Sequence, residues 1–226
     1  MTTATIALED FESDMTVAHH LERARLQRHF SVDVRRLHER EAAAYFAMAE
    51  RGRALVLIGF MGTGKSSAGR AVAHRLQVAR FDTDEIISAR FGLPVAEIFA
   101  RFGEVEFREA EIAALAELNG AAPAVIVTGG GIVLRPENVE RMQQLGAIVH
   151  LFANEETIFA RVSRRPTRPL LQTDNPRATL SLLLQEREPL YRPLADFELD
   201  TSTLSHEEVA DELIDFWEAG TLSRMQ

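Results

Sequence analysis

The sequence predicts an α/β protein whose doubly wound, five-stranded parallel sheet is preceded by a helical N-terminal extension. Short apolar segments alternate with helical periodicity from residue 54 onward, and a glycine-rich segment follows the first of them. Residues 1–53 show two capped helical stretches and no strand pattern. Short strands alternating with helices are typical of a parallel sheet covered on both faces. We therefore divide the chain into a helical extension (1–53), an α/β domain (54–218) and a tail (219–226).

The expected elements follow the chain in order. Capping residues at 13–14 and 31–33 begin the two helices of the extension, which end near residues 30 and 51. Strands are expected at 54–59, 78–82, 124–128, 147–152 and 197–200. Helices are expected at 65–76, 85–90, 95–101, 104–119, 136–145, 155–164, 177–190 and 206–217. Residues 165–176 hold three prolines and no apolar period, which predicts a loop that acts as a lid.

Composition excludes several classes of protein. The absence of cysteine excludes disulfides, thiolate metal sites and a cysteine nucleophile. The longest apolar run, 54–62, is far shorter than the roughly 20 residues of a membrane helix, and the N-terminus is acidic where a signal peptide is basic. A net charge of −9 argues against binding nucleic acid through net charge. We expect a cytoplasmic monomer with neither nucleic-acid nor membrane partners.

The only lysine of the chain, Lys65, lies in the most specific motif. Residues 59–66, GFMGTGKS, fit the pattern G-x-x-x-x-G-K-[ST] between a buried strand and a helix. Glycines let successive backbone N–H groups point at phosphate oxygens, and the helix N-terminus adds its positive dipole end. Lys65 would reach the β and γ phosphates of a nucleoside triphosphate, and the Ser66 hydroxyl would bind Mg²⁺. The motif predicts a nucleotide site without defining the reaction.

Two further segments lie at the carboxyl ends of expected strands, where ligands of open α/β sheets bind. Asp82 and Asp84 are two residues apart, so on a strand both carboxylates point the same way, one toward Mg²⁺ and one toward an acceptor hydroxyl. The alternative is a capping pair that begins the next helix. Residues 129–131 are three glycines, which form either a nest of N–H donors for a ligand or a plain tight turn.

Three arginines are candidates for binding an anionic substrate. Arg108 has Glu111 three residues on, Arg168 lies in the expected lid, and Arg187 lies at a helix end. A planar guanidinium binds a carboxylate or a phosphate through two parallel hydrogen bonds. The alternative for each is a structural arginine or a solvated surface residue.

Together these motifs resemble the shikimate kinase family over residues 54–217. The matching segments, in order, are GFMGTGKS (59–66), FDTD (81–84), FR-x-x-E (107–111), TGGG (128–131), RPLL (168–171) and REPLY (187–191). The first motif is shared by many NTPases, whereas the combination is far more specific. The resemblance implies a five-stranded P-loop kinase fold like that of nucleoside monophosphate kinases. It also implies ATP- and Mg²⁺-dependent phosphorylation of the shikimate 3-hydroxyl, in aromatic amino-acid biosynthesis.

The resemblance also implies roles for individual residues on the ATP side. Residues that surround the phosphates would be Gly62, Thr63, Gly64, Lys65, Ser66 and Ser67. Ser66 would bind one Mg²⁺ ion, with Asp82 in its outer shell. Arg161 would stack on adenine, and Leu204 replaces a basic residue that the family often has in the second adenine loop. Arg168 would move in with the lid and neutralise charge on the transferring phosphoryl group.

On the acceptor side, the resemblance implies that Asp84 contacts the shikimate hydroxyls and acts as the base. Arg108 and Arg187 would bind the carboxylate, and Gly129, Gly130 and Gly131 would bind shikimate through the backbone. The catalytic set would thus be Asp84, Lys65 and Arg168.

Two alternative functions remain open from the sequence. One is a related kinase of the same fold, acting on gluconate or a nucleoside monophosphate, because an arginine clamp accepts carboxylate or phosphate. The other is a regulatory protein in which the helical extension binds DNA or protein, although its arginines alternate with acidic residues.

Translation from Met15 or Met48 would shorten or remove the extension. The extension's four histidines show no metal-ligand spacing and suit a helix surface.

Overall fold

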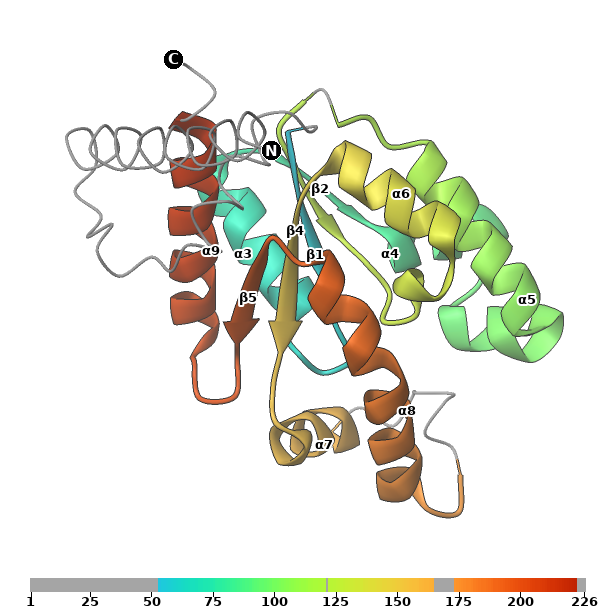
Figure 1. The fold of residues 1–226 in the computed structure, drawn as a ribbon. Helices are drawn as coiled ribbons and strands as arrows, with labels where there is room; N and C mark the ends of the chain where they lie inside the picture. The colour runs from blue at the N-terminus through green and yellow to red at the C-terminus, as the bar shows by residue number, and fades with distance from the viewer. Residues whose placement is uncertain (1–52, 121, 165–172, 223–226) are drawn as a thin grey trace, which may run out of the picture. The chain divides into compact units, whose positions relative to one another are not determined.

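The computed structural model of the chain describes residues 53–120, 122–164 and 173–222, and the fold below is that of these segments (Figure 1). The two expected helices of the extension lie outside the described residues. Arg168 and most of the expected lid, at 165–172, also lie outside them, as does the end of the tail at 223–226.

The five described strands form one parallel sheet, as predicted. They are β1 (Ala54–Ile58), β2 (Ala79–Asp82), β3 (Ala124–Val127), β4 (Gly146–Phe152) and β5 (Phe197–Asp200). Their spatial order is β2-β3-β1-β4-β5, and every neighbouring pair is parallel. All five residues of central β1 are buried, which explains its uninterrupted apolar sequence. The order reverses direction beside β1, so a crevice for ligands is expected at its carboxyl end.

Seven α-helices and two short 3₁₀ helices connect the strands within the described residues. The α-helices are α3 (Lys65–Leu76), α4 (Thr83–Phe91), α5 (Val95–Ala116), α6 (Pro136–Leu145), α7 (Glu155–Ser163), α8 (Pro176–Tyr191) and α9 (His206–Leu222). The 3₁₀ helices are η2 (Ile132–Leu134) and η4 (Arg192–Leu194). Two expected helices at 95–101 and 104–119 are the two halves of α5, which Gly103 interrupts with φ 82° and ψ 175°. Helix α9 continues five residues beyond the predicted end at 217.

The helices cover both faces of the sheet, as a doubly wound fold requires (Figure 1). Helices α3 and α9 pack on one face, where Val72 and Leu213 join Leu57 of β1 in one apolar cluster. Helices α5 to α8 contribute to the cluster on the other face, which contains Val56 of β1 and Leu180 of α8. Because both faces are covered, the carboxyl ends of the strands are left for ligands.

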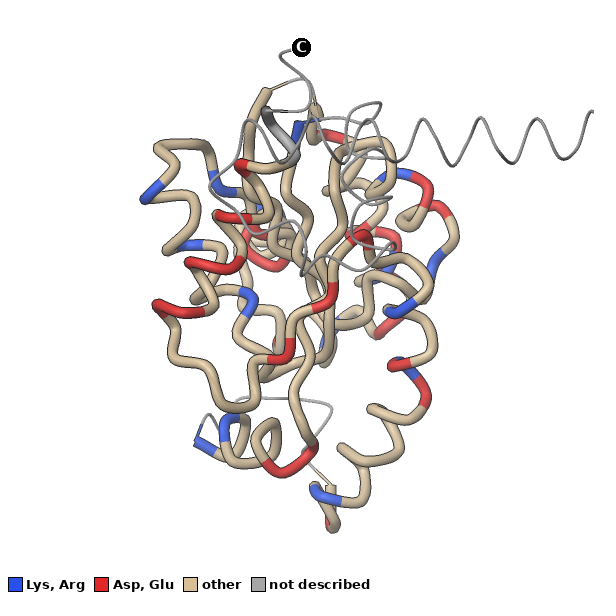
Figure 2. The backbone as a smooth tube through the Cα atoms, turned by 60° about the vertical axis from the view of Figure 1, so that its left-hand side comes forward, with Lys and Arg blue, Asp and Glu red and all other residues tan. Residues whose placement is uncertain are grey.

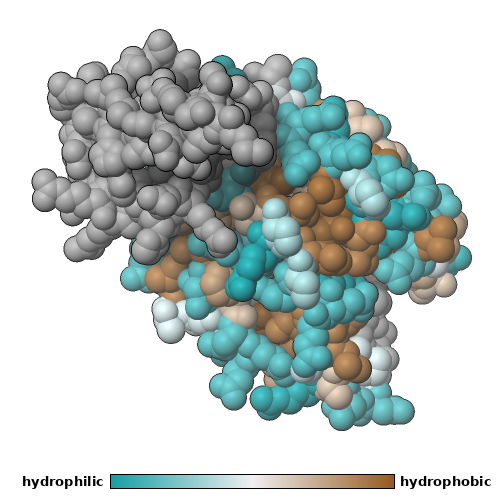
Figure 3. All heavy atoms as spheres, in the orientation of Figure 1, coloured by the Kyte–Doolittle hydropathy of each residue, from teal (hydrophilic) through white to brown (hydrophobic). Residues whose placement is uncertain are grey.

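Charged residues of both signs alternate around the described part of the chain (Figure 2). Exposed ion pairs connect some of them, such as Arg75 with Asp211 at 2.6 Å and Arg101 with Glu97 at 2.8 Å. Such pairs contribute about 0–1 kcal/mol each, so the buried apolar clusters carry most of the stability. The face seen in Figure 3 is largely hydrophilic, with hydrophobic areas between the polar ones. None of the described helices is long and apolar enough to span a membrane.

Candidate active site

The glycine-rich loop lies between β1 and α3, where the motif predicted it. Gly59, Gly62 and Gly64 have φ angles of 135°, 83° and 96°, which residues with a side chain rarely adopt. A side chain at Gly59 would also lie 2.1 Å from the carbonyl oxygen of Leu151. Helix α3 begins directly after Gly64 and has no side-chain cap at its N-terminus. Its first N–H groups and its dipole are therefore available to an anion.

The side chain of Lys65 is buried and bonded to its own loop. Its Nζ donates to the carbonyl oxygens of Gly59 and Phe60, at 2.8 Å each. Thr63 reinforces the same turn, since its hydroxyl donates to Phe60 O at 2.9 Å. Neighbouring Ser66 is exposed at the start of α3. The loop thus holds the ammonium group of Lys65 in place, and Ser66 is exposed to solvent.

Arg161 of α7 joins the phosphate loop to the segment that follows β5. Its Nη1 donates to Gly62 O at 3.3 Å and to Thr201 Oγ1 at 3.0 Å, and its Nη2 donates to Thr201 O at 2.6 Å. Thr201 in turn donates to Thr63 O at 3.1 Å. Arg161 therefore lies beside the phosphate loop and next to the segment expected to form the second adenine loop, although its guanidinium already bonds to the protein.

The expected geometry of the two aspartates is wrong. Strand β2 ends at Asp82, which is the N-cap of α4, and its Oδ1 accepts from the backbone N–H of Asp84 at 3.1 Å. Asp84 lies in the first turn of α4 rather than on the strand. The capping alternative is therefore correct, because an aspartate readily accepts the free N–H groups of a helix start. Capping directs the two carboxylates differently: Asp84 lines the pocket described below, whereas Asp82 pairs with Arg80 at 3.3 Å.

A pocket at the carboxyl end of the sheet collects the predicted acceptor residues. The cavity measures about 90 Å³, which suits a small ligand, since pockets for drug-sized molecules hold roughly 300–1,000 Å³. Its predicted members are Asp84, Arg108, Gly129, Gly130, Gly131 and Arg187. Its other lining residues are Met61, Val95, Phe99, Phe107 and Glu111. Of the four apolar ones, Met61 and Phe107 lie within motifs quoted above but were given no role, and the pattern around Val95 and Phe99 is that of an ordinary helix.

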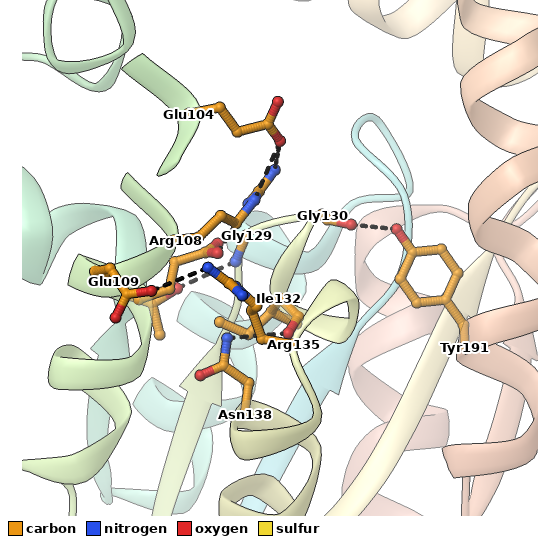
Figure 4. A network of polar contacts seen from close by, with 11 residues as sticks. Glu104, Arg108, Glu109, Gly129, Gly130, Ile132, Arg135, Asn138 and Tyr191 are labelled. Carbon is orange, nitrogen blue, oxygen red and sulfur yellow. Dashed lines mark hydrogen bonds and ion pairs between the residues drawn. The ribbon is translucent and has the colours of Figure 1, made fainter. Parts of the chain in front are cut away.

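Arg108 is buried on α5 and held by two carboxylates (Figure 4). Its Nε and Nη2 donate to Glu104 Oε1 at 3.2 and 2.7 Å, and its Nη1 donates to Glu111 Oε2 at 2.8 Å. Burial acts to lower the pKa of Arg108, but the two carboxylates outweigh burial and raise it. The guanidinium lies flat against Gly131, where any side chain would come within 2.3 Å of Nη1. The arginine is therefore charged and held in one orientation, and a side chain at position 131 would force its guanidinium to move.

Glu111 is fully buried, and its Oε1 has no hydrogen-bond partner among the described residues. Burial raises the pKa of its carboxyl to about 7; Arg108 acts to lower this pKa, and nearby Asp84 acts to raise it further. Glycine at 129 leaves room for both carboxylates, because a side chain there would lie 2.8 Å from Asp84 Oδ1 and 3.0 Å from Glu111 Oε1. Two acidic groups thus converge beside the glycine loop, with Arg108 opposing their charge.

Arg187 and Tyr191 reach the pocket region from α8. Arg187 is buried over the ring of Phe60, 6.0 Å from its centre, and its Nε has no hydrogen-bond partner among the described residues. A buried cation with an unsatisfied donor in a pocket favours an anionic ligand. The Tyr191 hydroxyl donates to the carbonyl oxygen of Gly130 (Figure 4). Sequence reasoning assigned Tyr191 no role, because this contact joins residues 61 positions apart.

The residues expected to hold Mg²⁺ have suitable chemistry. Ser66 and Asp82 offer hard oxygen ligands, and burial raises the pKa of Asp82, as does Glu85, while Arg80 opposes the shift. The described residues contain no cluster of three or more histidines or carboxylates that could hold a metal. Mg²⁺ typically takes one or two protein ligands and completes its shell with waters and nucleotide phosphates. The donor set therefore fits an ion that arrives with a nucleotide.

The fold and the two adjoining sites define a P-loop kinase that phosphorylates a small molecule. Comparison with known families assigns residues 61–218 to the shikimate kinase family. The chain is 46% identical over 164 residues to a shikimate kinase of Thermodesulfovibrio yellowstonii, an alignment that covers 73% of this chain and 94% of that protein. It is 43% identical over 174 residues to a shikimate kinase of Nitrobacter winogradskyi, covering 77% and 80%. The chain belongs to the shikimate kinase family.

Solved structures agree with this assignment. A shikimate kinase of Acinetobacter baumannii in complex with shikimate superposes with a TM-score of 0.71 at 33% identity, covering 79% of this chain and 99% of that one. A shikimate kinase of Aquifex aeolicus gives 0.64 at 31% identity, covering 75% and 98%. A gluconokinase of Sinorhizobium meliloti gives 0.51 at 19% identity, which shows a shared fold alone.

Proposed function

We propose that this protein transfers the γ-phosphoryl group of ATP to the 3-hydroxyl of shikimate, giving shikimate 3-phosphate and ADP in aromatic amino-acid biosynthesis. The observation that carries the proposal is the acceptor pocket, where two buried arginines, Arg108 and Arg187, flank a glycine loop beside Asp84. Shikimate carries one carboxylate and several hydroxyls, which match this set of cations, backbone groups and a carboxylate. Relatives at 43–46% identity are named shikimate kinases, and one solved neighbour contains shikimate.

In this mechanism the acceptor is positioned before it reacts. Arg187, with its unsatisfied Nε, and Arg108, oriented by Glu111, bind the carboxylate of shikimate. The loop of residues 129–131 approaches the ring through its backbone, since side chains at 129 and 131 would collide with the neighbouring charged groups. Asp84 then orients the reacting hydroxyl and accepts its proton. Fixing both reactants can supply a large part of the rate enhancement of a two-substrate reaction.

On the donor side, the protein supplies positive charge and backbone donors. The N–H groups of the glycine loop and of the start of α3 bind the ATP phosphates, and Lys65 leaves its loop carbonyls to bind the β and γ phosphates. Ser66, and more remotely Asp82, would hold one Mg²⁺ ion, which would supply positive charge to offset the negative charge of the phosphates. Arg161 contributes to the adenine side, and Arg168, outside the described residues, neutralises charge on the transferring group.

An acceptor survey tests the function directly. Purified protein is given ATP and Mg²⁺ with shikimate, gluconate or AMP, and ADP release is followed in a coupled assay. We expect turnover with shikimate and little with the other two, because the small cavity disfavours a nucleotide and relatives at 43–46% identity are shikimate kinases rather than gluconate kinases. Turnover with gluconate or AMP in preference to shikimate would contradict the proposal.

We further propose that residues 54–218 act as a monomeric catalytic domain in the cytoplasm, where ATP is available. The helical extension, 1–53, is then an addition that catalysis does not need. Light scattering at assay concentration and the activity of a chain beginning at Met48 test both points. Loss of turnover in the shortened but folded chain would show that the extension takes part in catalysis.

A further inference from the structure

His150 is a buried titratable side chain that the mechanism above does not use. It lies near the carboxyl end of β4, directly between Ile58, the last residue of β1, and Glu198 of β5. Its side chain is fully buried, and the residues before and after it on β4 are apolar. Burying an imidazole costs free energy unless its polar atoms are bonded, so a histidine here calls for an explanation.

One side of the imidazole lies against the phosphate-binding loop. A side chain placed on Gly59 would come within 3.3 Å of Cδ2 of His150, so the ring packs directly on this glycine. The carbonyl oxygen of Gly59 accepts the hydrogen bond from Lys65 Nζ. The ring of His150 therefore supports the residue from which the loop departs and to which the catalytic lysine is bonded.

The face of the same ring contacts Tyr191, which in turn bonds the acceptor loop at residues 129–131. The ring of Tyr191 stacks on the imidazole with 5.1 Å between ring centres and 26° between planes. The Tyr191 hydroxyl donates to the carbonyl oxygen of Gly130, in the middle of the glycine loop (Figure 4). A continuous series of contacts, Gly59 to His150 to Tyr191 to Gly130, thus connects the two loops.

Charged groups fix the imidazole from two elements. Its Nδ1 lies 3.2 Å from Glu198 Oε1 of β5, which also accepts from Arg192 Nε at 3.2 Å. Its Nε2 lies 3.9 Å from Glu188 Oε2 of α8 and has no hydrogen-bond partner among the described residues. Bonding through Nδ1 alone, with a stacked tyrosine on the face, holds the plane of the ring in one orientation.

We propose that His150 is a positioning residue for phosphoryl transfer, whose ring fixes the separation between the phosphate loop at Gly59 and the acceptor loop at Gly130. The inference rests on the proposed transfer of phosphate to shikimate. In such a reaction the two substrates bind separate loops, and a misplacement of about 1 Å can cost on the order of a hundredfold in rate. A spacer between the loops therefore acts on turnover more than on the binding of either substrate.

Truncation of the ring is the principal test. His150→Ala removes the spacer, and we expect kcat to fall at least about tenfold while the KM values for ATP and shikimate each change by less than about threefold. His150→Phe keeps a planar ring of similar size, and we expect it to restore kcat to within about threefold of wild type. A normal kcat in His150→Ala, or a kcat in His150→Phe as low as that of the alanine variant, would overturn the proposal.

Leu151→Ala is the matched control for a loss of packing. Leu151 is the next residue of β4, equally buried, and its side chain belongs to the cluster on the opposite face of the sheet. We expect a lower Tm in this variant, with kcat of the folded enzyme within about threefold of wild type. A loss of kcat equal to that of His150→Ala would show that loosened packing explains both, and would overturn the positioning role.

Tyr191→Phe tests the last link even if His150→Ala fails to fold. This variant keeps the stacked ring and removes only the hydroxyl that bonds Gly130, so we expect a fall in kcat with nearly unchanged KM values. Combined with His150→Ala, it should add little further loss, because both changes break one series of contacts. A wild-type kcat in Tyr191→Phe, or fully additive losses, would contradict the proposal. An inactive wild-type enzyme with shikimate would instead refute the proposed function.

Discussion

Arg108 shows at the residue scale how the site is prepared for its ligand. Glu104 and Glu111, four residues before and three after it on α5, bond to different edges of its guanidinium. The two carboxylates differ in exposure: the Glu104 side chain is 51% exposed, and that of Glu111 is fully buried. We infer that Glu111 is a permanent support, whereas Glu104 occupies the Nε and Nη2 donors of Arg108 that a carboxylate ligand would need.

Arg108→Ala should weaken the binding of shikimate specifically. A charge-assisted hydrogen bond contributes about 1.5–3 kcal/mol, so we expect the KM for shikimate to rise at least about tenfold, with the KM for ATP little changed. Steady-state kinetics with each substrate varied in turn measures this. Arg101→Ala, an exposed arginine on the same helix, is the control. An unaltered shikimate KM would remove Arg108 from the site.

Glu104→Gln should have the opposite effect. If the Glu104 carboxylate competes with that of shikimate for Nε and Nη2 of Arg108, removing its charge lowers the KM for shikimate. We expect a decrease of about two- to fivefold, because Glu104 is half-exposed and an ion pair open to solvent contributes at most about 1 kcal/mol. Glu97→Gln, which breaks the exposed pair with Arg101 on the same helix, should leave KM unchanged. A higher KM in Glu104→Gln would mean that Glu104 orients Arg108 instead.

Lys65→Arg should abolish transfer although it keeps the charge. Nζ of Lys65 fits between two carbonyl oxygens of its own loop, at 2.8 Å from each, a space suited to a compact ammonium group. A planar guanidinium is larger and presents its donors in a fixed fork. Rapid-quench measurement of phosphoryl transfer should show no product, whereas Arg70→Lys, an exposed position on the same helix, should behave as wild type. Substantial turnover in Lys65→Arg would refute this requirement.

At the scale of the element, the break in helix α5 lies directly before Glu104, which bonds Arg108. Gly103 has φ 82° and ψ 175°, a conformation that is essentially restricted to glycine. The residue that follows is Glu104, so the second half of the helix begins with a residue that accepts a hydrogen bond from Arg108. No atom lies within 4 Å of a side chain added at 103, so any cost of substitution is a backbone cost.

Gly103→Ala should therefore destabilise the protein through its backbone alone. We expect a loss of about 1–3 kcal/mol in the free energy of unfolding, measured by urea denaturation. Gly92→Asn is the control, because Gly92 has an ordinary left-handed conformation, φ 64° and ψ 21°, that asparagine tolerates. Equal stability of Gly103→Ala and wild type would show that α5 can adopt another path at this point.

At the scale of the whole molecule, His150 makes stability depend on pH. Burial lowers the pKa of His150 below 6.5 and Lys65 acts in the same direction, whereas Glu188 and Glu198 oppose the shift. The unfolded chain has the ordinary pKa, so between the two values it binds a proton that the folded protein does not. The stability present above pH 6.5 is therefore lost progressively as the pH falls below it.

The measurement is the Tm of wild type and His150→Phe between about pH 8 and pH 5. As the pH falls, the Tm of wild type should decrease more than the Tm of His150→Phe. His74→Gln replaces an exposed histidine of α3 and should follow the wild-type curve. Parallel curves for His150→Phe and wild type would show that burial does not depress the pKa of His150.

Local patterns were enough to predict most of the fold. Local sequence patterns predicted the ends of all five strands to within one residue, and the glycine-lysine motif placed the phosphate loop at the end of β1. The prediction that Asp82 and Asp84 point the same way was wrong, because helix α4 begins at Thr83 and places Asp84 in its first turn, with Asp82 as the N-cap. The predicted break between helices at 95–101 and 104–119 is confirmed, because Gly103 has non-helical angles within α5.

The sequence by itself determined the class of fold, the phosphate loop and the types of residue available to bind an anion, because each is encoded in neighbouring positions. Only the tertiary structure decided how distant residues meet. The contacts of Glu104 and Glu111 with Arg108 depend on rotamers, and those of Tyr191 with Gly130 and His150 depend on how α8 packs against the sheet. Contacts between segments far apart in the chain depend on the packing of whole elements, which no local pattern records.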